Sequence, residues 1–260
     1  MRKHSFLLAT AMYAAIATAM AAPASNWPAP IKALQTQGVE IMGRFDAPGG
    51  MQGYAGILQH KPIGIYLTPD GKQAIVGTML DAKGADLTAA PLKKLISKPM
   101  TAKTWSKLEQ SSWIADGNQG AQRIVYTFTD PNCTYCNKFW NDARPWVDAG
   151  KVQIRHIMVG IIKDSSAGKA AALLGAQDPP AALTQHEKQH ASGGIQAMAA
   201  IPADIRAKLD SNRKLMQELG FFATPTIFYK DPDGIMQTAQ GAPSAAALNV
   251  ILGTRQAGSR

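Results

Sequence analysis

Cysteine is scarce in this chain: Cys133 and Cys136 are the only two among 260 residues. Two cysteines cannot build a disulfide framework, and without a second pair they cannot provide the four ligands of a structural zinc site. A bridge between residues three positions apart closes a short loop, so it removes little entropy from the unfolded chain. The pair is therefore a poor structural staple and a good candidate for redox chemistry, with an inert bridge as the alternative.

Long apolar runs are also few. The longest extends from Phe6 to Met20, follows the basic residues Arg2 and Lys3, and ends at a small-residue cleavage pattern, as in secretory signal peptides. It is shorter than the roughly 20 residues of a membrane-spanning helix. We therefore expect residues 1–21 to be a cleaved signal peptide. The mature chain is expected in the periplasm, without stable membrane association.

Dense patches of like charge are missing too. The formal net charge is +9, yet the Lys and Arg residues are scattered along the chain. A clustered basic surface is the usual mark of a nucleic-acid-binding protein. The sequence therefore predicts no nucleic-acid partner, and no motif in it calls for a cofactor.

The mature length of roughly 240 residues allows two domains of ordinary size. The first, residues 22–85, has the pattern of a small α+β unit. A helix is expected around Ile31–Gln37, and turn residues Pro69-Asp70-Gly71 predict a hairpin between strands 64–68 and 73–77. A unit of this size buries only about 60% of its unfolded surface, so we expect its strand edges to pair with a second copy. This predicts a homodimer.

Residues 86–101 form the predicted linker. Apolar residues at Leu92, Leu95 and Ile96 alternate with lysines, which is typical of an amphipathic helix, and Pro91 and Pro99 are expected to bound it.

Residues 102–260 have the order of elements of an α/β thioredoxin-like domain. Strands are expected at 123–128 and 152–159, with a helix after the cysteine pair between them. Helical segments then fill 167–219, and a strand at 226–229 enters a hairpin before a last helix at 244–252. This succession predicts a layered α/β structure.

The run Cys133-Thr134-Tyr135-Cys136 carries the chemistry. Thiol–disulfide exchange needs one thiolate to attack a substrate sulfur and a second thiol to release the mixed disulfide. Between a strand and a helix, Cys133 falls at the helix N-terminus, where free N–H groups and the dipole favour its anion. We expect Cys133 to be the exposed attacking thiol and Cys136 to be the more buried resolving thiol.

A second part of the site is predicted at Thr224-Pro225, between a helical segment and a strand. Thioredoxin-like folds place a cis proline opposite the cysteine pair, at this point in the order of elements. The backbone of Thr224 is then expected to pair with an extended substrate, as are the residues between the cysteines, Thr134 and Tyr135. The alternative is a trans proline that begins an edge strand.

A rival motif is His186-Glu187-Lys188-Gln189-His190, which matches the H-E-x-x-H pattern of zinc proteases. The third histidine of the longer pattern is replaced by Gln196, and the neighbours are polar. Chance spacing of two surface histidines is the preferred interpretation, so no metal site is predicted.

Several stretches of the mature chain resemble one family. They are Phe45-Asp46-Ala47-Pro48-Gly49-Gly50, Ile65-Tyr66-Leu67-Thr68-Pro69-Asp70-Gly71-Lys72, Asp130-Pro131-Asn132-Cys133-Thr134-Tyr135-Cys136, the segment 143–152, and Thr224-Pro225. With them the chain resembles the DsbC/DsbG family of periplasmic thioredoxin-fold disulfide isomerases, and the cysteine count favours the DsbG branch.

The resemblance implies a V-shaped homodimer with an N-terminal cystatin-like dimerisation domain, a linker helix and a C-terminal catalytic domain. It implies isomerase or reductase activity on exported proteins, including those with sulfenylated cysteines, chaperone-like binding in the dimer cleft, and re-reduction by a membrane reductant of the DsbD type. Two departures stand out. Thr134 takes the place of a proline, and Thr127 stands where thioredoxins keep a buried acid.

Two other functions remain open from the sequence. One is a DsbA-like disulfide oxidase, which the extra N-terminal domain disfavours. The other is a non-catalytic dimeric holdase, which the cysteine pair together with Thr224-Pro225 disfavours.

Overall fold

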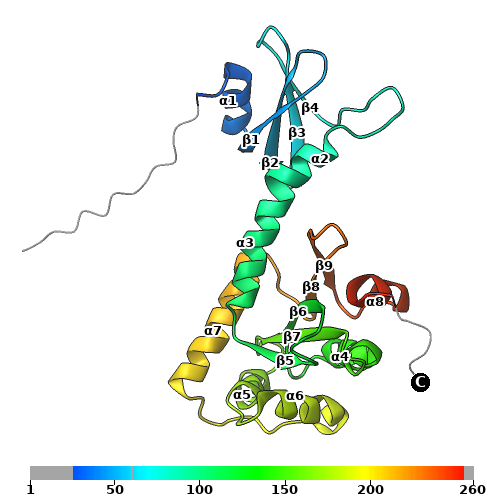
Figure 1. Ribbon diagram of the computed structural model, residues 1–260. Coiled ribbons are helices and arrows are strands. Elements are labelled where there is room, and N and C mark those ends of the chain that lie inside the picture. Colours follow the sequence, from blue (N-terminus) through cyan, green and yellow to red (C-terminus); the bar gives the residue numbers. More distant parts are fainter. Residues whose placement is uncertain (1–25, 60, 255–260) are drawn as a thin grey trace, which may run out of the picture.

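The computed structural model describes residues 26–59 and 61–254, so the predicted signal peptide lies outside the described residues. Two sheets joined by a long helix divide this part of the chain into two units (Figure 1). No helix in these ranges is long and apolar enough to cross a bilayer. The elements of the first unit are α1 (Ala29–Thr36), β1 (Glu40–Asp46), β2 (Gln52–Leu58), β3 (Lys61–Leu67) and β4 (Ala74–Val76).

The first unit is an antiparallel sheet in the order β1-β2-β3-β4, packed against α1. The predicted hairpin is confirmed: β3 pairs with β4, with Ile65 opposite Val76. Ile31 of α1 is buried against Tyr54 and Ile65 of the sheet. This core lies on the face that α1 covers, while Ala55 and Tyr66 are buried on the opposite face, where the Tyr66 hydroxyl bonds to Thr88. Strands β1 and β4 form the two edges of the sheet.

The linker is one continuous helix made of α2 (Ala89–Leu92), a π-helical turn (Lys93–Ser97) and α3 (Lys98–Glu109). The prediction that Pro91 and Pro99 bound this helix is wrong, because both lie inside it. A proline removes an N–H donor from the helix ladder, and a π turn changes the spacing of the ladder locally. Here the Lys98 N–H bonds to the Lys93 carbonyl, five residues back, one residue before Pro99.

The C-terminal half of this helix packs into the core of the second unit. Trp105 and Leu108 are buried in one cluster with Tyr126 and Phe128. The Thr101 Oγ1 also accepts a hydrogen bond from the Met236 N–H at 3.0 Å. The predicted boundary at residue 102 therefore falls within α3, and the helix bridges the two units.

The second unit has a five-stranded sheet in the order β5-β7-β6-β8-β9, in which β6 and β7 are parallel and the other pairs antiparallel. The α/β fold predicted from the sequence is confirmed. Its elements are β5 (Trp113–Asp116), β6 (Arg123–Thr129), α4 (Thr134–Val147), β7 (Val152–Met158), α5 (Asp164–Leu174), α6 (Pro179–Lys188), a 3₁₀ turn (His190–Ser192), α7 (Ala203–Glu218), β8 (Thr226–Lys230), β9 (Met236–Gln240) and α8 (Ala245–Leu252).

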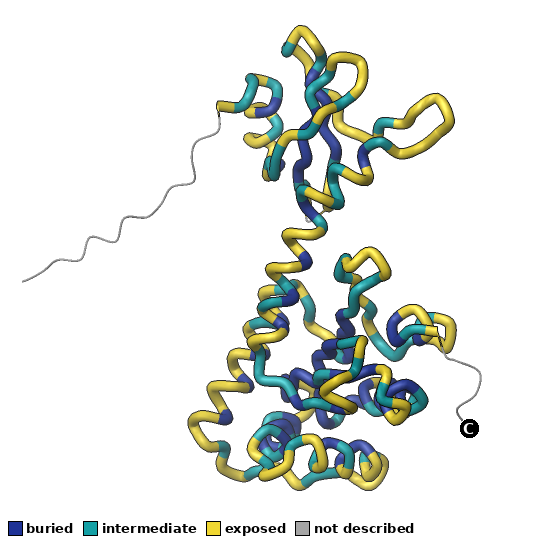
Figure 2. Tube along the Cα trace, viewed as in Figure 1, coloured by how far each residue is buried: buried dark blue, intermediate teal, exposed yellow. Residues whose placement is uncertain are grey.

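Strand alternation directs side chains to two helical layers. Val125 of β6 packs toward α4 and α8, whereas its neighbours Tyr126 and Phe128 pack toward α3 and α7. The buried segments consequently concentrate in the central strands and on the inner faces of the helices (Figure 2). This rigid sheet holds the loop after β6, which carries the cysteines.

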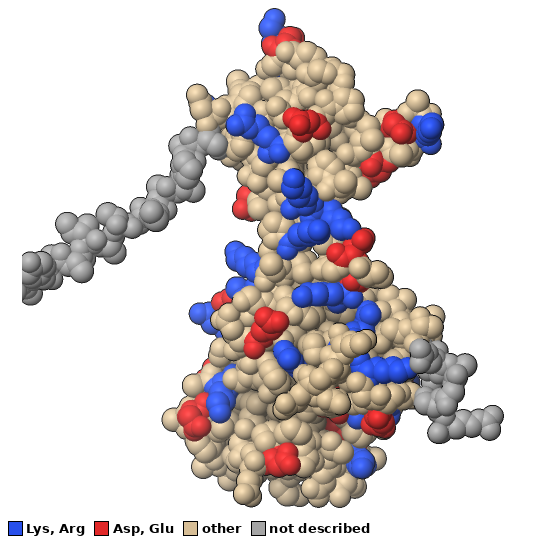
Figure 3. Space-filling view, in the orientation of Figure 1, with Lys and Arg blue, Asp and Glu red and all other residues tan. Residues whose placement is uncertain are grey.

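Basic side chains gather along the neck between the two units (Figure 3). Lys94 and Lys98 of the linker helix are exposed there. Lys93 forms an ion pair of 2.8 Å with Asp233, which joins the helix to the β8–β9 turn. Because the pair lies at the surface and Asp233 is largely solvated, it adds little to stability, and the apolar contacts of α3 carry the attachment.

Replacing Leu108 with alanine should therefore destabilise the second unit, although the residue lies outside the sheet. Leu108 is fully buried, so the substitution should cost about 2–5 kcal/mol of unfolding free energy. Chemical denaturation followed by tryptophan fluorescence measures this cost, with the exposed Lys103→Ala on the same helix as control. Equal stability of the two variants would mean that α3 is not part of this core.

Candidate active site

Cys133 is the N-cap residue of α4, as the sequence predicts. Its backbone is extended, at φ −85° and ψ 107°, and its sulfur accepts a hydrogen bond of 3.1 Å from the Cys136 N–H. N-cap positions in proteins are usually filled by oxygen-bearing side chains that accept from the same free amides. Here sulfur takes that role, so an anion on Cys133 meets the positive end of the helix.

The exposed surface of the two thiols is nearly the same, although Cys136 lies deeper, as predicted. The exposed fractions are 4% for Cys133 and 2% for Cys136, and both are free cysteines. The prediction that Cys133 is the exposed member of the pair is wrong, because the Thr224 backbone, far along the sequence, lies over its sulfur. Both thiols have little exposed surface, but burial dominates the pKa of Cys136, whereas hydrogen bonds dominate that of Cys133.

Uncharged donors stabilise the Cys133 thiolate. The largest contribution is the hydrogen bond from the Cys136 thiol; burial opposes it. The Thr224 hydroxyl and the backbone N–H groups at the start of α4 add to the stabilisation. Together they lower the pKa of Cys133 from 9.0 to about 7, so roughly half of it is thiolate at neutral pH.

Cys136 has the opposite tendency. Burial raises the pKa of its thiol well above the ordinary value, and the hydrogen bond to Cys133 and the negative charge there raise it further. The proton of the pair therefore stays on Cys136 while Cys133 is the anion. This agrees with the predicted division between an attacking and a resolving thiol.

The Thr224–Pro225 peptide bond is cis, as predicted, and it faces the cysteine pair. The Thr224 carbonyl accepts a hydrogen bond of 3.4 Å from the Cys133 S–H. Its Oγ1 is buried without a hydrogen-bond partner among the described residues, which leaves it available to a thiolate. The structure thus brings Cys133, Cys136 and Thr224 together.

The two residues between the cysteines point outward. Thr134 is exposed, and the exposed fraction of Tyr135 is 64%. They lie on the first turn of α4 beside Cys133 without lining the buried side of the pair. Their position is compatible with contact to an incoming protein, which is the role predicted for them.

Asp130, for which the sequence suggested no role, holds the loop before Cys133. Its buried carboxylate accepts from the Asn132 N–H at 2.8 Å, from the Ile162 N–H at 3.0 Å and from the Ser166 hydroxyl at 2.8 Å; it also accepts from the Ile161 N–H. The loop is thereby fixed to the start of α5. An aspartate between a strand and a proline was the available sequence signal, but three of its four partners lie more than 30 residues away.

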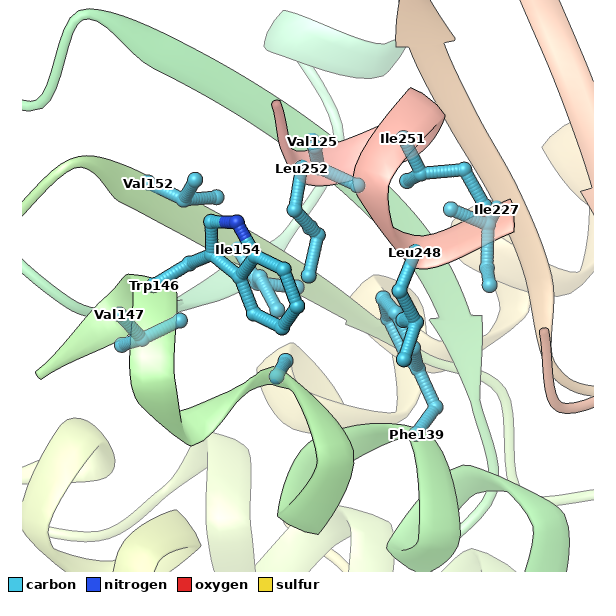
Figure 4. Packing of buried hydrophobic residues seen from close by; sticks show 11 residues of the cluster. Val125, Phe139, Trp146, Val147, Val152, Ile154, Ile227, Leu248, Ile251 and Leu252 are labelled. Atoms are coloured by element: carbon cyan, nitrogen blue, oxygen red, sulfur yellow. The ribbon is translucent and has the colours of Figure 1, made fainter. Parts of the chain in front are cut away.

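The far end of α4 is anchored by apolar packing. Phe139, Trp146 and Val147 of α4 lie against Ile154 of the sheet and Leu248 of α8 (Figure 4). This anchoring fixes the direction of the helix axis, and hence the direction in which its N-terminal amides point.

A buried ion pair adds to this anchoring. Arg144 of α4 binds both carboxylate oxygens of Asp116 on β5, one of them at 3.0 Å. His156 Nε2 lies 3.5 Å from the same carboxylate. Burial raises the pKa of Asp116, but these two partners outweigh it, so that its pKa is lowered.

No carboxyl group occupies the place of the buried acid of thioredoxins. Thr127 is fully buried there and donates weakly to the Phe128 carbonyl at 3.3 Å. His156 is its neighbour across the sheet and bonds to Thr129 instead, at 3.1 Å.

The H-E-x-x-H motif is not a pair of surface histidines, so that prediction is wrong for its first member. His186 and Glu187 are buried, and both ring nitrogens of His186 are in hydrogen bonds with other residues. Within the described ranges, no group of three or more His, Cys, Asp or Glu side chains is placed to hold a metal ion. The polar neighbours along α6 concealed this burial, because they lie on its solvent face.

Comparisons with known proteins agree with this geometry. Residues 114–256 match the family model of a thioredoxin-like domain. The chain is 50% identical over 246 residues to the thiol:disulfide interchange protein DsbG of Pseudomonas aeruginosa, covering 95% of this chain and 94% of that protein. It is 45% identical over 236 residues to the protein of the same name from Escherichia coli, covering 89% and 94%.

Among solved structures, the catalytic domain of Proteus mirabilis ScsC superimposes with a TM-score of 0.51. The sequence identity is 21%, and the match covers 60% of this chain and 96% of that domain. At this identity the likeness supports the thioredoxin-like fold alone.

Alkylation should distinguish the two thiols. In the reduced protein at pH 7, iodoacetamide should modify Cys133 at least about tenfold faster than Cys136, because only Cys133 is substantially ionised. The rate at Cys133 should rise with pH around a midpoint near 7. Peptide mass spectrometry after timed quenching measures both rates, and equal rates would contradict the assignment of roles.

Proposed function

The chain belongs to the DsbG family of thiol:disulfide interchange proteins, and from this membership we propose that it is a periplasmic thiol–disulfide oxidoreductase that reduces and isomerises disulfides in exported proteins. The observation that carries the proposal is the unequal thiol pair. The pKa of Cys133 is lowered to about 7, whereas that of Cys136, one turn along α4, is raised. An attacking thiolate beside a protonated partner is the arrangement that disulfide reduction requires.

The first step is attack by the Cys133 thiolate on one sulfur of a substrate disulfide. A new S–S bond forms between Cys133 and that sulfur, and the second substrate sulfur leaves as a thiolate that takes a proton from solvent. The Thr224 carbonyl then no longer receives the Cys133 S–H and is free to accept a backbone N–H of the substrate. We propose that Thr134, Tyr135 and Pro225 contact the substrate on either side of this bond.

The second step depends on the deprotonation of Cys136. Formation of the mixed disulfide removes the negative charge of Cys133, which is one of the causes of the raised pKa of Cys136. Cys136 can then lose its proton and attack Cys133 Sγ, which releases the reduced substrate. The two cysteines are left as a Cys133–Cys136 disulfide, because they have given two electrons to the substrate disulfide.

The same thiols can act on sulfenylated cysteines. The Cys133 thiolate would attack the sulfur of an S–OH group, and the departing hydroxide would take up a proton to form water. Cys136 would then resolve the mixed disulfide as before. In isomerisation, a substrate thiolate performs the second attack instead, and the enzyme pair leaves still reduced.

The oxidised pair needs an external dithiol to be reduced again, and we propose a membrane reductant of the DsbD type as that donor. Location in the periplasm would give access to such a donor and to oxidising conditions for the substrates. The signal-like pattern of residues 1–21 supports this location.

We further propose that the first unit forms a homodimer. Its edge strand β4 exposes Ile75 and Val76 to solvent by 54% and 46%, and Leu80 follows with 58%. An exposed apolar edge strand is a ready template for pairing with an identical strand, and self-pairing gives a closed two-fold dimer. The linker helices would then hold two active sites across a cleft suited to chaperone-like binding of proteins.

Cysteine variants test the chemistry. Cys133→Ser should abolish reduction of a protein disulfide such as insulin, whereas Cys136→Ser should accumulate mixed disulfides that survive acid quenching. Full reductase activity in Cys133→Ser would refute the mechanism. A holdase would be favoured if the wild type had no redox activity and the double serine variant protected unfolded proteins equally well. A DsbA-like oxidase would be favoured if the protein oxidised substrates faster than it reduced them.

Charge on the edge strand tests the dimer. Ile75→Lys combined with Val76→Lys should convert a dimer into a monomer in sedimentation velocity runs at micromolar concentration, because paired strands would then bury unpaired lysines. The variant should keep its rate on a small-molecule disulfide and lose isomerase activity on a scrambled protein. A wild-type monomer, or a variant that stays dimeric, would remove the basis for this proposal.

A further inference from the structure

The buried H-E dipeptide of the rival motif has no place in the mechanism described so far. His186 Nε2 lies 2.9 Å from the Pro131 carbonyl, and Nδ1 lies 3.0 Å from the Ile195 backbone nitrogen. A backbone N–H only donates, so Nδ1 must be the acceptor and Nε2 must carry the hydrogen that Pro131 accepts. His186 is therefore a neutral ring fixed in one tautomer.

The surroundings of His186 favour this neutral state. Burial lowers its pKa; the hydrogen bond to Pro131 and the carboxylate of Asp130 oppose that effect. Repulsion from His190 in its protonated form and from the Lys169 ammonium lowers it further. A second proton on Nδ1 would also face the Ile195 N–H, which cannot accept it.

The loop around Ile195 is shaped to this ring. Gly194 has φ +61°, and a Cβ at that position would lie 2.2 Å from His186 Nδ1. Only glycine can bring the backbone so close to the imidazole. The ring is thus enclosed between this loop and the loop that precedes Cys133.

Pro131 has no N–H, so its carbonyl is the one backbone group through which a hydrogen bond can hold this residue. The residue is buried and stands two positions before Cys133. The Asp130 carboxylate accepts from the N–H of the Pro131–Asn132 peptide, and His186 binds the carbonyl of the same peptide.

Glu187, the next residue of α6, holds the other side of the cysteine pair. The Asn137 side-chain amide donates to the Glu187 carbonyl at 2.8 Å and to its Oε2 at 2.7 Å. Asn137 directly follows Cys136. Two consecutive residues of α6 therefore bind the chain two positions before Cys133 and one position after Cys136.

We propose that His186 and Glu187 are positioning residues of the active site, which hold the C-x-x-C turn from both sides so that the first amides of α4 stay directed at the Cys133 sulfur. The inference rests on the proposed function only in taking Cys133 as the attacking thiol. If the clamp is released, the Cys133 thiolate should lose part of its hydrogen bonding and ionise at higher pH.

The test is the ionisation of Cys133 in the full chain, followed by thiolate absorbance at 240 nm. His186→Leu and Glu187→Leu should each raise the midpoint by about 0.5 to 1 pH unit, and lower the alkylation rate at pH 7 by about two- to fivefold. His186→Gln retains an amide donor for Pro131, and Glu187→Gln retains an acceptor for Asn137. Both should keep the midpoint within a few tenths of the wild-type value.

The matched control is His190→Gln, on the second histidine of the same motif. The His190 Nε2 makes no hydrogen bond within the described residues, so the ionisation midpoint of Cys133 should not move in this variant. A folded Leu variant with the wild-type midpoint would overturn the proposal. If the Leu variants fail to fold, His186→Asn replaces them in the test. The asparagine keeps an acceptor near the Ile195 N–H but is too short to reach Pro131. An unchanged midpoint of Cys133 in that variant would also overturn the proposal.

A wild-type midpoint at the ordinary value of 9.0 would instead contradict the proposed function, because Cys133 would then not be an activated thiol. The two failures are thus distinguishable. If His186 and Glu187 had a merely structural role, the Leu variants would have a lower thermal unfolding midpoint, but the glutamine variants would not selectively restore the ionisation midpoint of Cys133.

Discussion

The hydrogen bond from the Cys136 amide to the Cys133 sulfur is the interaction on which the rest of the structure depends. It exists only while Cys133 stays at the N-cap and α4 begins at the next residue. The apolar cluster under α4 and the Asp116–Arg144 pair fix the helix, while the Asp130 carboxylate fixes the loop. Each of these contacts restrains a different part of one short turn, and the chemistry of the pair follows from the restraint.

The pair is tuned chiefly by neutral groups. The main contributions that lower the pKa of Cys133 come from a thiol, a hydroxyl and backbone amides, with no charged side chain among them. Such donors act at short range and lose their effect when the geometry shifts, unlike a distant charge. This explains why a catalytic unit of this kind needs a closely held loop.

The cysteine motif, the N-cap position, the β3–β4 hairpin and the cis proline were predictable because each is encoded in a few adjacent residues. The burial of Cys133 was not, since Thr224 covers it from 91 residues away. The extent of the linker helix was missed because a π turn accommodates Pro99. The polar sequence neighbours of His186 predict a surface residue, whereas its partners, Pro131 and Ile195, meet it only in the folded chain.

The central claim is that uncharged donors at the start of α4 make Cys133 an attacking thiolate at neutral pH. Titration of the reduced protein at 240 nm, in low salt and again at about 1 M salt, tests it most directly, because salt at that concentration screens solvent-exposed charged side chains beyond roughly 3 Å and leaves hydrogen bonds in place. The account predicts a midpoint near 7 at both ionic strengths. A midpoint that rises by a unit or more in high salt would contradict it, since a cationic side chain would then be holding the thiolate.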